Sequence, residues 1–410
     1  MKPIRIVFVD KDFSRFATFP LIGSFLIDYL NIHNRLRILS AKRRKIVFSR
    51  VDYCLTLISS IFLGIENLNK IDDCLETENK LAELLGIEGK TFPKRTACYE
   101  FLSGCTHWNV KQIDRINLDL LKEHSLLNKK RTLIVDIDQT TKSTEGIKIE
   151  RSKPGFNIKR KGRASLKYSI SLVGGYIFSK RLESGNTHCI TNFKSIYTET
   201  RNKLKQIPGI ENKPLILRID GGYCSRETLE FTAQEQIGFV TKCKINLVAV
   251  KALLKANNDR WQPLKERVEY LYFKEQRVYP DWPIKYNILI IKEKQKRLKS
   301  RNRQTYHTIK EVRYALISNL DYAPMRLWLF YKGRQTIENC FKEHNQSFTA
   351  SKLPSHKFYG NAFYFDLVCL CYNISFFFKR YVDNKTLQKM QFQLHKDKIY
   401  KISWSDIIRK

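Results

Sequence analysis

The sequence lacks paired cysteine spacings, long uninterrupted apolar runs and low-complexity linkers. Its ten cysteines form no CxxC motif and no Cys/His ladder, so they are expected to be small buried hydrophobic residues rather than zinc ligands or disulfides. The two most apolar stretches, 55–68 and 363–378, are too short or too interrupted to span a bilayer and predict buried helices. The N-terminus lacks the layout of a signal peptide. We therefore expect a cytoplasmic protein with no membrane partner.

Acidic residues are also scarce relative to basic ones. Forty Asp and Glu stand against 74 Lys and Arg, which leaves a formal net charge of +34. So much charge of one sign opposes compaction unless a polyanion offsets it. Nucleic acid is the first candidate partner. The alternatives are a soluble basic protein with no such partner and, less favoured, a protein that binds membrane surfaces.

Hydrophobic periodicity divides the chain. Residues 20–125 repeat apolar positions at three- and four-residue steps, which indicates an all-helical region. The helical segments in 71–87 and 90–104, joined by a turn that contains glycine, are compatible with a helix-turn-helix DNA reader or an ordinary helical hairpin. From 131 the pattern changes to strands, with Gly174–Gly175 as a hairpin turn. The order of strands and helices predicts an α/β domain with a mixed sheet over 126–244 and 312–382. A β-rich insertion (245–311) and a basic tail (383–410) complete the expected organisation.

Two aspartates, Asp136 and Asp138, close the apolar run "TLIVDID". Residues i and i+2 of a strand face the same side, so the two carboxylates should repel each other. A bound cation, a neighbouring Arg or Lys, or exposure at the strand end would compensate. The apolar strand "LILRID" repeats the feature at Asp220. Sites in open α/β sheets gather beyond the carboxyl ends of the strands, and two parallel neighbouring strands would bring Asp138 and Asp220 together.

A third acidic residue lies on a helix predicted from about Pro324 to His344. Tyr331, Arg334 and Glu338 fall at i, i+3 and i+7, with Lys342 extending the stripe. An ordinary solvated helix face would show the same spacing. The helix also has a separate apolar side, so the polar stripe is free to face the two strand ends.

Three converging carboxylates in a basic protein predict a site for hard divalent cations. Mg²⁺ or Mn²⁺ prefer oxygen ligands. Two such ions can activate a water or a 3′-hydroxyl and stabilise the leaving oxygen in phosphoryl transfer. We expect Asp138 to be a metal ligand and Asp136 to support or flank it.

Three blocks, "DIDQTT", "IDGGYCS" and "YKGRQTIENCFKE", resemble the acidic blocks of DDE-class insertion-sequence transposases. They are similar in particular to the bacterial group with a Tyr-x₂-Arg-x₃-Glu-x₆-Lys signature, and the likeness extends over about residues 50–380. The resemblance implies an RNase H-like catalytic domain with Asp138, Asp220 and Glu338 as the catalytic and metal-binding triad. It also implies that Tyr331 and Arg334 contact DNA phosphates. The lysine of the signature is replaced by Asn345, so Lys342, about one turn back, is the remaining candidate for that contact.

The function expected from this resemblance is cut-and-paste DNA transposition. Its partners would be the element's terminal inverted repeats and target DNA, and synapsis of two ends suggests a homodimer. The basic segment 159–167 and the run 292–303 are expected to bind phosphates, and Trp261 or Trp282 to stack on a flipped base, although burial within the insertion is the alternative for both tryptophans. A nuclease that cuts without joining and an inactive DNA-binding descendant are the competing interpretations. The predicted DNA-binding residues are Lys159, Arg160, Lys161, Arg163, Trp261, Trp282, Tyr331, Arg334 and Lys342.

Overall fold

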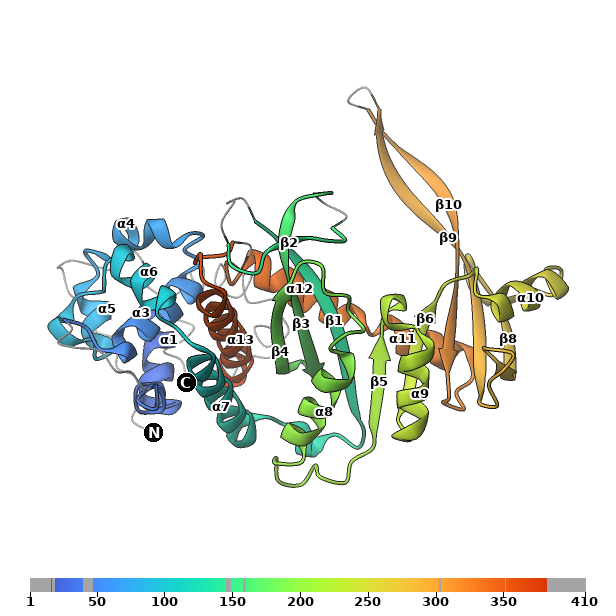
Figure 1. The fold of residues 1–410 in the computed structure, drawn as a ribbon, viewed down its shortest axis with the longest axis horizontal. Coiled ribbons are helices and arrows are strands. Elements are labelled where there is room, and N and C mark those ends of the chain that lie inside the picture. Colours follow the sequence, from blue (N-terminus) through green and yellow to red (C-terminus); the bar gives the residue numbers. More distant parts are fainter. Residues whose placement is uncertain are drawn as a thin grey trace, which may run out of the picture. The chain divides into compact units, whose positions relative to one another are not determined.

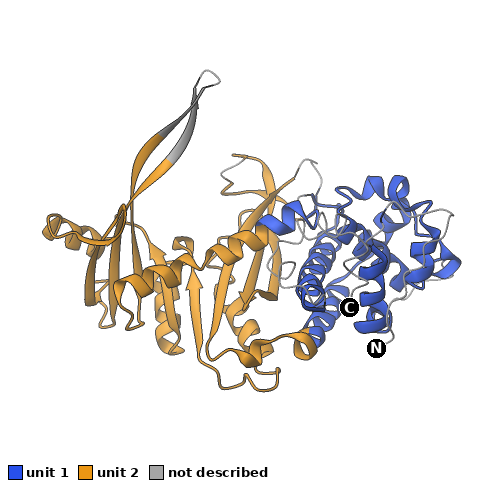
Figure 2. Cartoon of the chain, turned by 180° about the vertical axis from the view of Figure 1, so that it is seen from behind, with its two compact units in different colours: residues 1–120, 148–150, 342–410 blue, residues 121–147, 151–341 orange. Residues whose placement is uncertain are grey.

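The computed structural model describes residues 16, 19–39, 47–144, 149–157, 160–301, 304–350 and 352–381. The predicted basic tail, Lys159 and part of the run 292–303 lie outside these residues. The chain forms two compact units (Figure 2), with 1–120, 148–150 and 342–410 in unit 1 and 121–147 and 151–341 in unit 2. Unit 1 thus groups 342–381 with the N-terminal helices, whereas the expected boundaries placed them with the sheet. The boundaries of the functional domains stay a prediction.

Unit 1 is helical in the described residues, as the periodicity of 20–125 predicts. A π-helical turn, Phe25–Tyr29, follows the first helix, and the last turn of α7 belongs to unit 2. The helices are α1 (Phe19–Ser24), α2 (Ile32–Leu36), α3 (Arg50–Leu63), α4 (Ile71–Leu75), α5 (Asn79–Leu84), α6 (Arg95–Ser103), α7 (His107–His124) and α13 (Phe358–Tyr381).

The core of unit 1 is built on α3 and α13, which pack against each other. Helix α3 begins with a capping box, in which Ser49 Oγ accepts from Asp52 N and Asp52 Oδ2 accepts from Ser49 N, and it ends at Gly64 in the left-handed region. Among the described helices, α13 alone is long and apolar enough to cross a membrane, and α3 with residues 68–75 would qualify as one span only across a 100° bend. Of the most apolar window of α13, 94% is buried inside the protein, as in the core helix of a soluble domain.

Unit 2 contains the β-sheet and its flanking helices (Figure 1). Its strands are β1 (Leu133–Ser143), β2 (Lys153–Pro154), β3 (Ala164–Val173), β4 (Tyr176–Ser184), β5 (Leu215–Ile219), β6 (Gly238–Cys243), β7 (Gln262–Lys265), β8 (Val268–Arg277), β9 (Lys285–Arg301) and β10 (Gln304–Ser318). Its helices are α8 (Phe193–Leu204), α9 (Arg226–Gln234), α10 (Val248–Ala256), α11 (Pro324–Lys332) and the first half of α12 (Gln335–Gln346), with a 3₁₀ turn at Gly221–Tyr223.

The strand order confirms the mixed α/β fold. The path β4-β3-β1-β5-β6 has β3 antiparallel to both of its neighbours and β5 parallel to β1 and β6, which is the RNase H-like arrangement that the resemblance implies. The hairpin between β3 and β4 has a two-residue loop, Gly174–Gly175, and both glycines have positive φ. Two-residue hairpins of this kind need positive φ, which glycine adopts without steric cost.

The predicted β-rich insertion is present as β7, β8, β9 and the first part of β10, together with the short helix α10. It joins the sheet because the end of β10 pairs with β6. Pairing of β8 with β9 ends at Glu293, and pairing of β10 with β6 begins at Ala315. Between these limits β9 and β10 pair only with each other and project as a two-stranded ribbon (Figure 1).

The sequence pattern predicts that β1 ends at Asp138, but the strand continues to Ser143. Asp136 is therefore inside the sheet, where it lies directly opposite Arg218 of β5 in the parallel register. The Arg218 Nε and Nη2 atoms donate to the two oxygens of Asp136 at 2.6 and 2.7 Å, and both residues are buried. Burial raises the pKa of the Asp136 carboxyl against the opposing effect of Arg218. The bidentate pair provides the compensation that the sequence demands for Asp136.

The predicted continuous helix 324–344 is broken into α11 and α12 at Gly333–Arg334. Arg218 explains the break, since its Nη1 donates to the Phe330 carbonyl at 2.7 Å, at the end of α11. A Cβ on Gly333 would lie 2.1 Å from that same nitrogen, so any larger residue there would force the guanidinium to shift. Arg218 thus fixes both the β1–β5 register and the junction from which α12 starts.

The Arg218–Asp136 pair gives a stability prediction. Arg218→Met leaves a buried carboxylate without its partner and should lower the free energy of unfolding by about 3–5 kcal/mol. The double variant Asp136→Leu/Arg218→Met removes both charges and should recover most of that loss. Urea denaturation measures both. If Arg218→Met were as stable as the parent protein, the pair would not have the stabilising role assigned to it.

Candidate active site

The register of β1 and β5 places two predicted acids next to each other. The last parallel pair is Ile137 with Ile219, and Asp138 and Asp220 follow it on adjacent strands. Asp220 turns the chain into the 3₁₀ segment, since its Oδ1 accepts from Gly221 N at 2.6 Å. Asp138 Oδ1 accepts from the backbone of Gln139 at 2.9 Å. One oxygen of each carboxylate is thus held by the backbone, while the other faces the side chain of Arg334.

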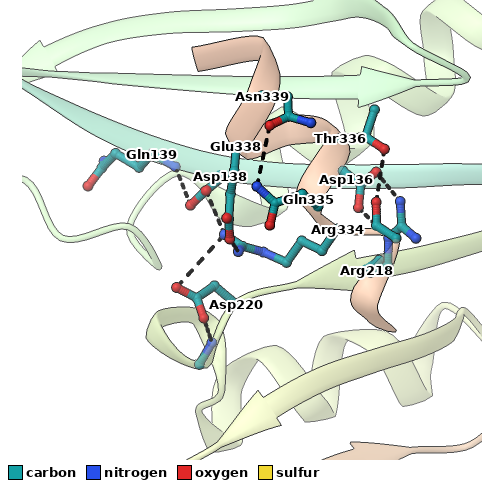
Figure 3. A network of polar contacts seen from close by, with 12 residues as sticks. Asp136, Asp138, Gln139, Arg218, Asp220, Arg334, Gln335, Thr336, Glu338 and Asn339 are labelled. Carbon is teal, nitrogen blue, oxygen red and sulfur yellow. Dashed lines mark hydrogen bonds and ion pairs between the residues drawn. The ribbon is translucent and has the colours of Figure 1, made fainter. Parts of the chain in front are cut away.

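The side chain of Arg334 joins all three predicted catalytic acids (Figure 3). Its Nη2 lies 2.5 Å from Asp138 Oδ2 and 3.8 Å from Asp220 Oδ2, and its Nη1 lies 2.6 Å from Glu338 Oε1. The Arg334 side chain is only 8% exposed, and its buried Nε has no hydrogen-bond partner among the described residues. The structure therefore brings Asp138, Asp220 and Glu338 around one point and places a guanidinium there.

The electrostatics of this cluster are dominated by burial. Desolvation raises the pKa of Asp138 to about 6, although Arg334 and the Gln139 N–H oppose the change. The surrounding carboxylates raise the pKa of Arg334 further above its usual range, so the guanidinium is a permanent charge. Asp220 and Glu338 keep about half of their side-chain surface in solvent, 46% and 48%, while Asp138 keeps 16%. The cluster is buried at Asp138 and open at the other two acids.

The donor set suits a hard divalent cation, but its arrangement here is occupied by arginine. Carboxylate oxygens are the ligands that Mg²⁺ and Mn²⁺ prefer. Among the described residues, no group of three or more His, Cys, Asp or Glu is arranged to hold a metal ion. The three acids would form such a group only if Arg334 left the space between them. The assignment of Asp138, Asp220 and Glu338 as metal ligands stays a prediction.

The predicted phosphate-binding residues lie in different surroundings. Tyr331 is partly exposed at the end of α11, and Lys342 is exposed on α12, one turn after Glu338. Arg160, Lys161 and Arg163 are exposed in the loop before β3. Lys167, at the end of that predicted basic segment, is instead buried, and its Nζ donates to Thr141 Oγ1 and the Phe156 carbonyl. Internal hydrogen bonds thus account for Lys167. The roles of the other residues stay predictions.

The two tryptophans of the insertion differ in exposure. Trp261 is partly exposed, with Lys292 Nζ 4.4 Å from its ring centroid and the Arg313 guanidinium 5.8 Å away. Trp282 is 7% exposed and packs against Tyr279 and Tyr286. The geometry of Trp282 fits the alternative interpretation, a tryptophan that buries hydrophobic area within the insertion. Stacking on a base stays a prediction for Trp261.

Arg218 is the important residue that the sequence analysis did not single out. The only signal is a charged residue inside the apolar strand "LILRID", two positions before Asp220. A charge in such a strand needs a buried partner. That partner, Asp136, is 82 positions earlier in the chain. Its identity depends on the strand register, which local patterns do not encode.

An RNase H-like sheet with one acid in β1, one directly after β5 and a third on a following helix is typical of enzymes that transfer phosphoryl groups on nucleic acids. Residues 28–409 match the family model "Transposase DDE domain group 1". The match covers most of the chain, so this protein belongs to the DDE transposase family. The resemblance to DDE transposases that the acidic blocks suggested is confirmed.

No curated protein matches the sequence. Several solved structures show distant similarity, among them two transposase complexes. "Mos1 transposase paired-end complex with left transposon end" is 12% identical over 49% of this chain and 60% of that chain, with a TM-score of 0.19. "Drosophila P element transposase strand transfer complex" is 11% identical over 54% and 43%, with a TM-score of 0.21. This chain covers less than two thirds of the length of each of these two structures. At such low TM-scores, no conclusion about fold or function is drawn from them.

Burial predicts different effects for the tryptophans. Trp282→Ala removes a large buried ring and should destabilise the protein by about 3–5 kcal/mol. Trp261→Ala should cost clearly less, and Trp108→Ala, at a site 69% exposed, serves as the control. Thermal unfolding of the three variants tests this ranking. Equal stability of the Trp282 variant and the parent would contradict its placement in the insertion core.

Proposed function

We propose that this protein is a cut-and-paste DNA transposase that cleaves DNA at the ends of an insertion sequence and joins those ends to target DNA. The observation that supports it most is the convergence of Asp138, Asp220 and Glu338, from β1, β5 and α12, on one point. Membership of the DDE transposase family supplies the substrate class. The proposed place of action is the bacterial cytoplasm, and the proposed active form is a homodimer that holds two ends.

In the cleavage step a water oxygen forms a bond to phosphorus while the bond to the 3′-oxygen breaks. The proton lost by the water is balanced by the proton gained by the leaving oxygen. In the joining step the freed 3′-hydroxyl attacks a target phosphate and expels a target 3′-oxygen. One phosphodiester forms for each one that breaks, so joining needs no external energy source.

The three carboxylates would hold one or two Mg²⁺ or Mn²⁺ ions, which when bound supply activation of the attacking oxygen and stabilisation of the leaving oxygen. The chain's own contribution is positional. Backbone N–H groups of Gln139 and Gly221 orient Asp138 and Asp220. Glu338 lies in the first turn of α12, where the helix dipole stabilises a negative charge.

The ribbon of β9 and β10 supports the proposal of a DNA partner. Exposed Lys294, Lys296 and Lys310 lie on the stretch that pairs with no other strand. A two-stranded β-ribbon fits the major groove of DNA, and lysines on it neutralise phosphates. Isolated two-stranded ribbons are marginally stable in water, so a bound duplex would also stabilise this one.

Variants of the triad test the activity. Asp138→Asn, Asp220→Asn and Glu338→Gln each remove one ligand charge, and each should reduce cleavage by roughly 1,000-fold or more, with no further loss on combination. Glu227→Gln, which disturbs only an exposed pair with Lys194, is the control and should cut normally. The measurement is a strand-transfer assay on duplex DNA with and without divalent metal.

The same assay separates the alternatives. Cleavage without joined products would indicate a nuclease, and binding without cleavage an inactive DNA-binding protein. Triad variants that cut at the parental rate would end the proposed mechanism, and loss of activity in Asp136→Asn but not Asp138→Asn would reverse their assignment. Inverted repeats in the DNA flanking the coding region would independently support a mobile element.

Salt dependence tests the ribbon. About six neutralised phosphates give a slope near −5 for log affinity against log salt. Lys294→Gln/Lys296→Gln/Lys310→Gln should make that slope shallower by about 1 for each lost contact. The matched control, Lys129→Gln/Lys130→Gln/Lys205→Gln, changes exposed lysines near the opposite end of β1 and should keep the parental slope. Equal slopes for both triple variants would remove the ribbon from the DNA interface.

A further inference from the structure

Arg334 is the cation that the three acids share. All three carboxylates pair with this one guanidinium, at 2.5, 2.6 and 3.8 Å. The side chain is only 8% exposed, and in the part of the chain that the structure describes its Nε has no hydrogen-bond partner. The arrangement therefore neutralises charge on the acids but leaves one N–H group of the arginine without a hydrogen bond. The guanidinium is therefore held by charge, with part of its hydrogen-bonding capacity unused.

A divalent cation and this guanidinium cannot be held by the same oxygens together. Both are positive, and Arg334 occupies the space between the oxygens that would bind the ion. Metal binding to the triad therefore requires Arg334 to leave. A displaced guanidinium without an anionic partner would lose three carboxylate contacts, which opposes the displacement.

A DNA phosphate can provide the replacement partner. Arginine binds phosphate as readily as carboxylate, through the same pairs of N–H groups. The open side of the cluster, at Asp220 and Glu338, is where a duplex would approach, since these side chains are about half exposed. A phosphate there would draw Arg334 outward and expose the acids.

We propose that Arg334 is a positioning residue that couples the two ligands: it shields the three carboxylates in the absence of DNA and releases them when a DNA phosphate takes its place as the partner of the guanidinium. This inference rests on the proposed function, because it takes the acids as metal ligands and DNA as substrate. It has a thermodynamic consequence. Metal and duplex must each raise the other's affinity by the same factor, on the order of 10-fold.

Mn²⁺ binding, followed by electron paramagnetic resonance of the free ion, tests the coupling. The parent protein is titrated with Mn²⁺ with and without a short duplex, and the duplex alone is titrated to subtract its own ions. We expect about 10-fold tighter binding with DNA present. Arg334→Gln should bind Mn²⁺ tightly without DNA and gain little on its addition. Arg334→Lys keeps a cation, so its Mn²⁺ affinity with and without DNA should remain closer to that of the parent. This variant can be measured even if Arg334→Gln fails to fold.

Arg326→Gln is the matched control. Arg326 is exposed on α11, where it stacks over Tyr322 at 4.0 Å, so its loss removes one positive charge but should leave the coupling intact. Unchanged Mn²⁺ affinity in DNA-free Arg334→Gln, or equal coupling in this variant and the parent, would overturn the inference. Absence of cleavage with the coupling intact would count against the proposed activity alone, because the titration measures binding and no product.

Discussion

The contact of Arg218 with Asp136 and with the end of α11 is the constraint on which the rest of the site depends. Two strands of a parallel sheet can slip relative to each other, but a buried bidentate pair across β1 and β5 is satisfied in one register only. That register sets Asp138 beside Asp220. Through the Phe330 carbonyl and the missing side chain of Gly333, the same guanidinium fixes where α12 begins. One arginine thus determines the positions of acids that come from three different elements.

The repulsion between Asp136 and Asp138 is compensated because each carboxylate pairs with a different arginine. Asp136 is neutralised permanently by Arg218, which is buried with it. Asp138 is paired with Arg334, whose other partners, Asp220 and Glu338, are half exposed. The first pair is closed to solvent and suited to holding a register. The second opens toward solvent at one side, so its partners can be exchanged without taking the sheet apart.

Sequence patterns were sufficient for those features that depend on neighbours in the chain. The helical and strand periods, the Gly174–Gly175 turn and the acid after β5 all follow from local rules, and the acidic blocks led to the correct family. The break at Gly333 and the extension of β1 to Ser143 did not follow from them. Glycine in a helical pattern is usually tolerated, and only the approach of Arg218, more than 100 positions earlier, makes it a junction here. Burial of Trp282 was likewise decided by the packing of the insertion.

The candidate site carries three acidic side chains in a protein with a strongly positive net charge. This difference in charge explains why a cation at the position of Arg334 matters. A net charge of +34 would attract the proposed DNA substrate from a distance, whereas three carboxylates at the proposed reaction centre would repel its phosphate. A positive group at their centre reduces that repulsion before any metal ion is bound. Burial raises the pKa of the Asp138 carboxyl to about 6, and Arg334 opposes that rise, so the nearby cation favours the ionised form of this carboxylate. An arginine that starts among the acids and is drawn to the phosphate would allow the duplex to approach a partly neutralised surface. The acids would then become available only once the duplex has arrived.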